Sequence, residues 1–537
     1  MIFFIRRLSM LLLLVFFITS CSETGKKNPP NILFIMSDDH AYQAISAYSD
    51  HLTQTPNIDR IAEEGMLFSN ACVTNSICAP SRAVIFTGKH CHINGKVDNL
   101  FPFDTTNVTF PQILQQNGYQ TALFGKLHFG NNPAGFDAFK ILPGQGHYYN
   151  PDFITKNEGK IRVEGYTTDI ITDMTISWLQ DERDGDRPFF LAYLHKAPHR
   201  EWLPAERHYR EYTRRTFPEP QTLFDDYEGR GSAAREAEMN LLEHMNWAGD
   251  SKIRPEVMDQ LGIPETSDWD KRAYLNNIEN RMSPEQLKAW NAVYDSVNRT
   301  FAELYAEGMS GRALMQWRYQ RYMQDYLGSI ASVDEGVGRV LDYLEASGLD
   351  KSTVVVYTSD QGFYLGEHGW FDKRFIYEES FKTPLLIRWP GVTEQGSRCE
   401  EMVQNLDFAQ TFLEIAGIAA PEDMQGESLV PLLKGDIRAW DRDAVYYHYY
   451  EYPSVHMVKR HYGIVTTDYK LVHFYYDVDE WELYDRKGDP MEMQNVYDDP
   501  DYAEVRQELH ERLDSLRVYY KDSEELDRKY IEMYENH

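Results

Sequence analysis

Residues 76–88, SICAPSRAVIFTG, combine a cysteine, a proline and an arginine at a spacing that suits anion binding. Pro80 fits the first turn of a helix, where its missing N–H costs nothing, and Gly88 can end that helix. Cys78 would then lie at the helix N-terminus, where free N–H groups and the helix dipole favour negative charge, with Arg82 one turn further on. The stretch is consistent with a nucleophile held beside an anion, and equally with a small buried residue at a strand-to-helix turn.

Two other stretches offer oxygen ligands for a metal ion. Asp38 and Asp39 follow the apolar run NILFIM, and Asp360 and Gln361 follow TVVVYT. One Asp-Asp pair alone is usually a solvated turn or a helix cap, but two donor pairs at the ends of two buried strands favour a metal. Carboxylate and amide oxygens suit Ca²⁺ or Mg²⁺, and the cysteines and histidines lack the spacing that is typical of zinc sites.

Positively charged side chains accompany these oxygen donors in the same parts of the chain. A divalent ion ringed by Lys, Arg and His suits a tetrahedral oxyanion ester, because charge on the ester oxygens is neutralised while the leaving oxygen receives a proton. We therefore predict sulfuryl or phosphoryl transfer. The candidates are Arg82, Lys126, Lys373, His128, His199 and His368.

Four apolar runs position these residues. They are short, continuous and rich in Val, Ile and Phe, which is typical of buried strands in a parallel sheet, and each is followed by a polar cluster. Ligands bind at the carboxyl ends of such strands, so the four clusters are expected to form a single site. The runs are NILFIM (31–36), TALF (121–124), PFFLAYL (188–194) and TVVVYT (353–358).

The rest of the chain predicts one large α/β domain with a smaller companion, as its 537 residues suggest. A large mixed or parallel sheet flanked by helices would span 31–435, with a long helix over 313–348 and a charged helical insertion over 205–312. Residues 436–537 predict a C-terminal subdomain of antiparallel strands, followed by a charged helix from about Asp501.

The N-terminus predicts a targeting signal. Arg6 and Arg7 precede the apolar run MLLLLVFFI, which is too short to span a membrane as a mature helix, so residues 1–21 are expected to form a signal peptide. The following ITSC resembles a bacterial lipobox. We expect lipid on Cys21, a polar tether over 22–30, and a periplasmic or surface lipoprotein of the bacterial cell envelope that contacts the membrane only through this anchor. A plain secretory signal is the alternative.

Charge and the remaining cysteines restrict the other partners. The formal net charge of −30 argues against nucleic acid as a partner. With Cys21 and Cys78 assigned elsewhere, Cys72, Cys91 and Cys399 are left. One disulfide among these three would suit an oxidising compartment, and the sequence does not decide between a bridge and free thiols.

The run Cys78-Ala79-Pro80-Ser81-Arg82 resembles the Cys-x-Pro-Ser-Arg signature of type I sulfatases. NILFIMSDDH, GYQTALFGKLHFG, FFLAYLHKAPH and VVYTSDQGFYLGEHGWFDKRFIYEES resemble further blocks of that family in the same order, and the similarity extends from about residue 30 to about residue 500. The resemblance implies the fold of the alkaline phosphatase superfamily and hydrolysis of a sulfate ester. It also implies that a maturation enzyme oxidises Cys78 to Cα-formylglycine (3-oxoalanine).

The resemblance also assigns roles to residues. Arg82, Lys126 and His128 would hold the formylglycine hydrate and the sulfate, with His128 removing the second proton. Lys373 would bind sulfate, and His199 would be the general acid, with His195 as its competitor. The family often has Asn or His where Gln361 stands, but the amide oxygen is retained. The implied calcium ligands are Asp38, Asp39, Asp360, Gln361 and the modified Cys78.

Within the family, HKAPHREWLP and HMVKRHYG resemble carbohydrate sulfatases that act on N-acetylglucosamine-6-sulfate from glycosaminoglycans. A sulfatase for N-sulfoglucosamine or iduronate-2-sulfate is an alternative. A phosphomonoester or phosphonate hydrolase of the same superfamily and a non-catalytic, lipid-tethered glycan-binding protein are others. The predicted sugar contacts are Asp372, Arg374, His456 and Arg460.

Overall fold

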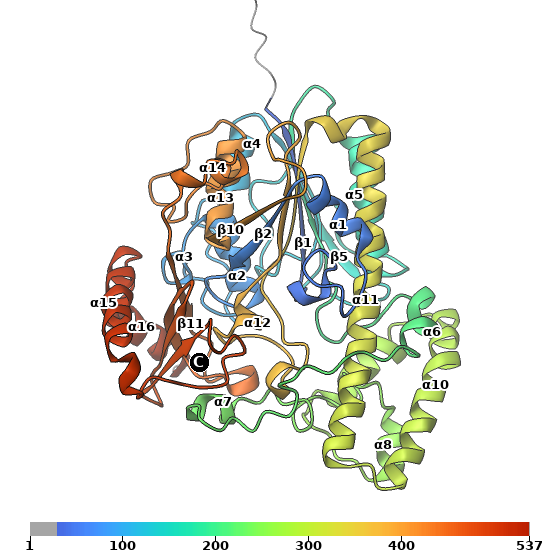
Figure 1. The fold of residues 1–537 in the computed structure, drawn as a ribbon. Helices are drawn as coiled ribbons and strands as arrows, with labels where there is room; N and C mark the ends of the chain where they lie inside the picture. Colours follow the sequence, from blue (N-terminus) through green and yellow to red (C-terminus); the bar gives the residue numbers. More distant parts are fainter. Residues whose placement is uncertain (1–28, 536–537) are drawn as a thin grey trace, which may run out of the picture.

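The computed structural model describes residues 29–535, and two β-sheets form its framework (Figure 1). The predicted signal peptide, the lipobox cysteine and most of the predicted tether lie outside the described residues. The larger sheet has ten strands in the order β10-β2-β9-β8-β1-β7-β3-β4-β5-β6. Its outer strands are β2 (Met66–Cys72), β4 (Ala138–Ile141), β5 (Asp152–Thr155), β6 (Gly159–Arg162), β9 (Leu385–Arg388) and β10 (Ser397–Gln404).

The four predicted strands lie side by side at the centre of this sheet and run parallel. Along β1, Ser37 is opposite Ser359 of β8, and Met36 is opposite Leu194 of β7, so the strands end at the same level. The predicted convergence of their carboxyl ends is confirmed. The four strands are β8 (Thr353–Ser359), β1 (Asn31–Ser37), β7 (Phe189–Leu194) and β3 (Gln120–Gly125).

Helices cover both faces of the sheet (Figure 1). Successive side chains of a strand point to opposite faces. Accordingly, Leu33 and Ile35 of β1 belong to one core cluster, and Ile32, Phe34 and Met36 belong to the other. The first cluster packs under α1 (Pro56–Glu63), α5 (Thr167–Ser177) and α11 (Gly311–Ser347), and the second under α2 (Cys78–Thr87), α4 (Phe110–Gln116) and α13 (Phe408–Ile415). The short helix α14 (Val430–Leu433) also packs on the second cluster. Two further short helices lie elsewhere: α3 (Cys91–Asn94) and α12 (Glu378–Phe381).

The long helix expected over 313–348 is α11, which ends at Gly348 in the left-handed conformation. The helix also holds part of the stretch expected to be a helical insertion. Arg318 of α11 donates to the carbonyl of Leu242 at 2.9 Å, and Gln320 donates to the carbonyl of Phe217 at 2.8 Å.

Residues 205–312 are less helical than expected, since 213–231 and 237–254 contain no helix. Only one short helix, over 232–236, separates these two irregular segments. Side chains of α11 satisfy backbone groups there that a helix would satisfy internally. The helices of this stretch are α6 (Tyr209–Tyr212), α7 (Ser232–Glu236), α8 (Pro255–Leu261), α9 (Asp270–Tyr274) and α10 (Pro284–Ala306).

The second sheet is antiparallel and lies near the C-terminus (Figure 1). Together, the two sheets confirm the predicted fold class, a large mixed sheet flanked by helices with a smaller antiparallel sheet. The domain boundaries remain predictions. His448 Nδ1 lies 2.7 Å from Asp522 Oδ2, which ties the sheet to the segment between the two last helices. The elements are β11 (Ala444–Tyr449), β12 (His461–Thr466), β13 (Tyr469–Phe474), β14 (Glu480–Asp485), α15 (Ala503–Tyr519) and α16 (Glu524–Glu535).

The cysteines of the described chain are all free thiols, so none of them forms the disulfide that the sequence left open. Cys72 donates to the carbonyl of Val403 at 3.3 Å, and Cys91 accepts from the amide of Asn75 at 3.7 Å. Cys399 is buried on β10.

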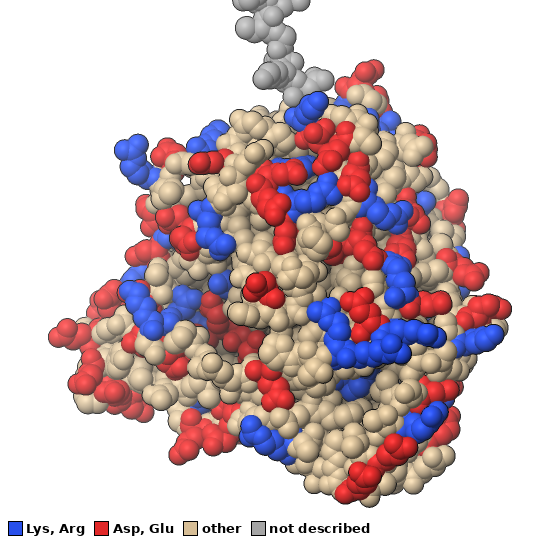
Figure 2. Space-filling model, turned by 45° about the vertical axis from the view of Figure 1, so that its right-hand side comes forward, with Lys and Arg blue, Asp and Glu red and all other residues tan. Residues whose placement is uncertain are grey.

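Acidic and basic side chains are interspersed on the face of the molecule shown in Figure 2. Within residues 29–535, no helix combines the length and the apolar character that crossing a membrane requires.

Candidate active site

The oxygen donors of the predicted metal site lie at the ends of β1 and β8. Asp38 and Asp39 follow β1, and Asp360 and Gln361 follow β8; all four side chains are fully buried. The backbone N–H of Asp39 donates to Asp360 Oδ1 at 3.1 Å, which links the two strand ends. Asp38, Asp39 and Asp360 each offer an oxygen that lies within 4.8 Å of the others. The register of the sheet therefore brings together residues that are more than 300 positions apart.

Helix α2 begins at Cys78 and ends at Thr87, just before Gly88, as the sequence predicts. The side chain of Cys78 is fully buried, and its Sγ accepts from Lys373 Nζ at 3.3 Å and faces Gln361 Nε2 at 3.9 Å. Burial, aided by the negative charge of Asp38, raises the pKa of the Cys78 thiol far above its usual range. An unmodified Cys78 is thus a protonated thiol, which is a poor nucleophile.

Three cations surround the carboxylates. Arg82 Nε lies 2.9 Å from Asp360 Oδ2, and Lys373 Nζ lies 2.5 Å from Asp39 Oδ1. Lys126 Nζ forms an ion pair with Asp38. Burial alone would raise the pKa of Asp38, but the nearby positive charges, led by Lys126, outweigh burial and hold that pKa well below its usual range.

The other two carboxylates have raised pKa values. Burial is the main cause, and repulsion between the carboxylates adds to it: the pKa rises to about 6 for Asp39 and to about 7 for Asp360. Asp38 Oδ1, Asp39 Oδ2 and Gln361 Oε1 are buried without a hydrogen-bond partner in the described structure. Unpaired buried acceptors are costly, and a hard cation would both pair them and relieve the repulsion. The residues present therefore fit a divalent metal ion.

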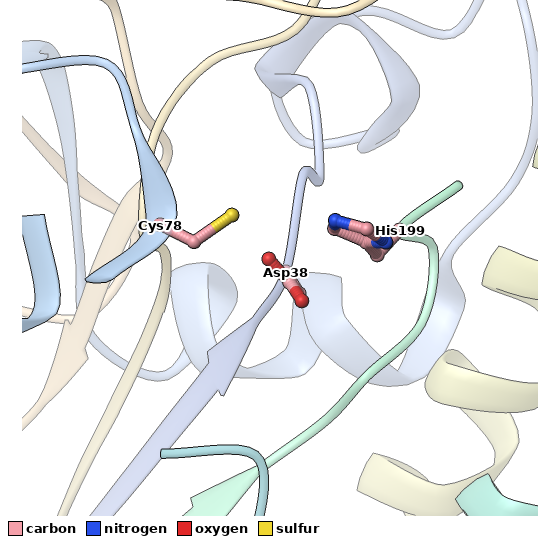
Figure 3. Close-up of side chains that lie close together, drawn as sticks. All are labelled: Asp38, Cys78 and His199. Carbon is pink, nitrogen blue, oxygen red and sulfur yellow. The ribbon is translucent and has the colours of Figure 1, made fainter. Parts of the chain in front are cut away.

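His199 reaches this cluster from the loop after β7. Its Nδ1 donates to the carbonyl of Arg200 at 2.5 Å, which directs Nε2 toward Asp39 Oδ2 at 3.8 Å. Atoms of His199, Asp38 and Cys78 lie within 4.8 Å of one another (Figure 3). Burial, followed by the charge of Lys126, lowers the pKa of His199 well below its usual range. In this structure Nε2 is therefore a free imidazole nitrogen beside the candidate nucleophile.

The other histidines are placed differently. His195 is fully buried against Tyr193, with ring centroids 4.3 Å apart, and burial lowers its pKa to about 3. The structure thus brings His199 to the cluster and packs His195 against Tyr193. His128 follows Lys126 by two residues, and its buried Nδ1 has no hydrogen-bond partner among the described residues. His368 lies away from the cluster and pairs with Asp225 at 3.0 Å.

Three of the four predicted sugar contacts form one network beside Lys373. Asp372 Oδ1 accepts from Arg374 Nε at 3.2 Å and from the backbone N–H of Lys373 at 2.8 Å. Asp372 Oδ2 lies 3.3 Å from His456 Nε2, and Arg374 pairs with Glu451 at 2.8 Å. His456 and His199 line the same cavity of about 700 Å³. The network therefore adjoins the space that leads to the cluster.

The fourth predicted contact, Arg460, is not brought to this cavity. Its Nε donates to the carbonyl of Tyr452 at 3.0 Å and its Nη2 to the carbonyl of Tyr530 at 3.3 Å, and its guanidinium lies 4.7 Å from the ring centroid of Tyr534. The side chain fastens α16 to the C-terminal sheet. The structure thus gives the guanidinium of Arg460 partners within the protein and does not bring it to the other three predicted contacts.

Backbone conformation marks the same region. Left-handed backbone is uncommon outside glycine, and strained residues of this kind cluster at functional sites. Such residues persist only where the surrounding structure holds them in place. Six residues that the sequence singled out have positive φ. Five lie in this region, and the sixth, His368, lies away from it: Asp39, His128, Asp372, Arg374, His456 and His368.

Two cavity residues were missed by the sequence analysis, although both lie in the run HKAPHR. Lys196 is nearly buried and lies 4.7 Å from the ring centroid of Tyr148. Arg200 pairs with Asp250 at 2.5 Å and lies 3.3 Å from His456 Nε2. Their position beside His199 in the sequence could have identified them as candidates. Asp250 lies in the irregular part of the insertion, where no sequence pattern singles it out.

Comparisons with known proteins agree with this geometry. The sulfatase family model matches residues 30–418, and a model of the C-terminal part of N-sulphoglucosamine sulphohydrolases matches residues 366–519. An N-acetylglucosamine-6-O-sulfatase of Bacteroides thetaiotaomicron is 48% identical over 518 residues, which cover 94% of this chain and 90% of the relative.

Solved structures of other proteins have a fold similar to that of this chain. One structure, described as a complex with its substrate D-glucosamine-2-N,6-O-disulfate, matches with a TM-score of 0.88 and 48% identity, covering 94% of this chain and 100% of that chain. A phosphonate monoester hydrolase of Agrobacterium radiobacter, at 21% identity and a TM-score of 0.64 over 91% of this chain and 96% of its own, shares the fold alone. From the family match, the identity and the arrangement of the site, the chain belongs to the sulfatase family of sulfuric ester hydrolases.

Proposed function

We propose that this protein removes the 6-O-sulfate of N-acetylglucosamine residues derived from glycosaminoglycans. The observation that carries the proposal is the meeting of Cys78, Asp38 and His199 within 4.8 Å at the carboxyl ends of the central strands. The bacterial relative named as an N-acetylglucosamine-6-O-sulfatase supports the choice of sugar and of position.

The proposed nucleophile is the formylglycine formed from Cys78 by a maturation enzyme, since sulfatases use a formylglycine and a metal ion. A hydrated aldehyde would supply one hydroxyl for attack on sulfur and a second whose loss of a proton releases sulfate. The protonated state of the buried thiol is consistent with a need for this modification.

The proposed metal is Ca²⁺. Asp38, Asp39, Asp360 and Gln361 would hold it, together with the modified Cys78, because their side chains offer hard oxygen donors. One such oxygen of Asp38, of Asp39 and of Gln361 is buried without a hydrogen-bond partner in the described structure. When bound, the ion would neutralise charge on the sulfate and favour the deprotonated form of the nucleophilic hydroxyl.

The remaining residues of the chain would bind the sulfate and move protons. Lys373 and Lys126 would neutralise sulfate oxygens, and Arg82 would hold Asp360 in place through its 2.9 Å contact. The negative charge of a bound sulfate would favour the protonated imidazole of His199. The protonated ring would then donate its Nε2 proton to the leaving sugar oxygen, since Nδ1 is committed to the carbonyl of Arg200. His128, whose buried Nδ1 is unpaired in the described structure, would take the second proton.

For the location of the protein we propose a lipoprotein of the bacterial cell envelope, anchored through Cys21. Strand β1 begins at Asn31, at the end of the sheet opposite the candidate site, so an anchor that precedes it would leave the cavity facing away from the membrane. A mass spectrum of the mature N-terminus tests this proposal, and an N-terminus without lipid would contradict it.

A panel of position-defined substrates tests the proposed activity. The panel contains N-acetylglucosamine-6-sulfate, N-sulfoglucosamine, a 2-sulfated uronic acid and N-acetylglucosamine-6-phosphate. We expect release of the 6-sulfate to have the highest kcat/KM. Faster release of the N-sulfate, of the 2-sulfate or of phosphate would replace the proposal with that activity. Inactivity on all four by protein with a verified formylglycine would contradict catalysis on these sugars.

Metal removal is expected to cost both activity and stability. A ligand that binds only the folded state stabilises it, by about 2.7 kcal/mol at 100 times its Kd, so exhaustive chelation should lower Tm and Ca²⁺ should restore it. Asp39→Asn should weaken this response, whereas Asp50→Asn, at an aspartate whose side chain is 80% exposed, should not. Calorimetry and metal analysis measure both effects.

Zinc is the relevant competitor in this experiment, because a thiol, an imidazole and a carboxylate at Cys78, His199 and Asp38 could also ligate zinc. Stoichiometric zinc in the active protein would contradict the calcium proposal. So would activity that is indifferent to chelation.

A further inference from the structure

The cavity of about 700 Å³ extends beyond the residues assigned to the sulfate. His199 and His456 lie in its wall, on the side of the residues proposed to bind the metal and the sulfate. The insertion contributes Asn246, Ser267 and Trp269 to the wall. Cavities of this volume match ligands larger than one small anion. The cavity therefore has room for more of the substrate than its sulfate group.

Trp269 is the aromatic residue of this wall that the insertion supplies. Its side chain is 46% exposed, which is unusual for a tryptophan of a folded protein. The guanidinium of Arg272 lies 5.9 Å from the ring centroid, so the ring is supported by a neighbour on its own helical segment. An exposed ring in a cavity wall offers a flat apolar surface to a ligand.

The ring is also bonded to the loop after β7, which carries the proposed acid His199. Trp269 Nε1 donates to Glu201 Oε1 at 3.1 Å, and Glu201 follows the proposed acid His199 by two residues. The other carboxylate oxygen of Glu201 accepts from Asn277, and its backbone carbonyl accepts from Lys252 Nζ at 2.8 Å. These bonds hold the indole in a set position relative to His199, although the two lie in segments 70 residues apart.

Polar groups near the ring complete the lining. His147 pairs with Asn277 at 2.7 Å, and Ser267 Oγ donates to Asn246 Oδ1 at 2.9 Å. Lys196 Nζ adds a positive charge to the same wall. A flat apolar surface beside amide, hydroxyl and imidazole groups suits a pyranose ring, which has apolar C–H faces and a rim of hydroxyls.

We propose that Trp269 is the stacking platform of a second sugar subsite, which takes the sugar linked to the one that carries the scissile sulfate. The proposal rests on the proposed carbohydrate sulfatase activity and adds a preference for chain length. The cavity is continuous from His199 to Trp269, so the occupant of its outer part is the remainder of the same saccharide. Trp269 is thus a specificity-determining residue and does not act on the sulfate.

The test compares a monosaccharide with longer saccharides. Substrates are N-acetylglucosamine-6-sulfate alone and disaccharides that extend it on either side. The wild type is expected to have a higher kcat/KM on at least one disaccharide. Trp269→Ala should lower that value about tenfold more than the value for the monosaccharide, equivalent to about 1.4 kcal/mol. Trp269→Phe should retain most of the preference, and Tyr519→Ala, at an aromatic side chain of α15 that is 68% exposed, should leave it unaltered.

Two outcomes would contradict the proposal that Trp269 is a stacking platform. One is an equal loss on monosaccharide and disaccharides in Trp269→Ala, and the other is a wild type that shows no preference for either disaccharide. Failure of the proposed activity is a separate result, namely no release of the 6-sulfate from any of the three substrates. Calorimetry on Cys78→Ala with and without Trp269→Ala then tests the platform without turnover: about tenfold weaker binding of the disaccharide supports it, and equal binding refutes it.

Discussion

Replacing Cys78 with alanine is expected to abolish sulfate ester hydrolysis while leaving the fold intact. Loss of a covalent nucleophile typically leaves only residual catalysis, so the expected decrease in kcat is on the order of 10⁴-fold or more. The fold should survive because Cys78 begins α2, where alanine is a favourable residue, and because the change removes a single buried sulfur. Circular dichroism and a desulfation assay measure the two parts of the expectation.

Two matched variants sharpen this experiment. Cys399→Ala removes a buried cysteine from β10 and should retain activity. Cys78→Ser should be arrested after one turnover, because an ordinary alcohol lacks the second hydroxyl that releases sulfate, and the protein should gain the mass of one sulfuryl group. Full activity in protein whose residue 78 is shown by mass spectrometry to be unmodified cysteine would refute the formylglycine assignment.

Replacing His199 with alanine is expected to separate sugar sulfates from activated aryl sulfates. A sugar alkoxide is a poor leaving group that needs a proton in the transition state, whereas a nitrophenolate leaves readily without one. General acid catalysis typically contributes about 10²- to 10⁴-fold, so kcat on a sugar sulfate should fall by that factor and on a nitrophenyl sulfate by much less. Steady-state kinetics on both substrates give the comparison.

Two further variants serve as controls for His199. Lys373→Ala should lower activity on both substrates, because Lys373 is proposed to bind the sulfate that they share. His195→Ala should not discriminate between them, because its ring packs against Tyr193 away from the cluster. Equal losses on the two substrates for His199→Ala would remove it as the acid, and a selective loss for His195→Ala would transfer the role.

Much of the fold was predictable because its signals are local. The central strands are continuous apolar runs, and strands buried on both faces require such runs. Polar pairs such as Asp38-Asp39 and Asp360-Gln361 directly follow these runs, and parallel strands place their carboxyl ends at one edge. Helix α2 (Cys78–Thr87) could likewise be predicted, from a proline in its first turn and a glycine after its last turn.

The choice between neighbouring residues depended on tertiary contacts. His195 and His199 are four positions apart in one run, and residue type does not distinguish them. The path of the loop after β7 does: His195 packs into the core beside Tyr193, whereas the Nδ1 bond from His199 to the carbonyl of Arg200 directs its other nitrogen to the cluster. The placement of Arg460 depended on tertiary contacts as well, since its proximity to His456 in sequence does not reveal that it bonds to the carbonyls of Tyr452 and Tyr530.

The four central strands, helix α2 and the polar clusters that follow the strands could be predicted from the sequence, because each is encoded by residues within a few positions of one another. The roles predicted for the residues in these clusters came from the resemblance to sulfatases. Which cationic and imidazole groups meet the carboxylates, and which part of the insertion lines the cavity, depended on contacts between distant segments. Residues 237–254 carry no periodic pattern, and Trp269 is tied to the loop after β7 by one hydrogen bond to Glu201. Contacts between segments this far apart depend on how the whole chain packs, and local residue patterns do not encode them.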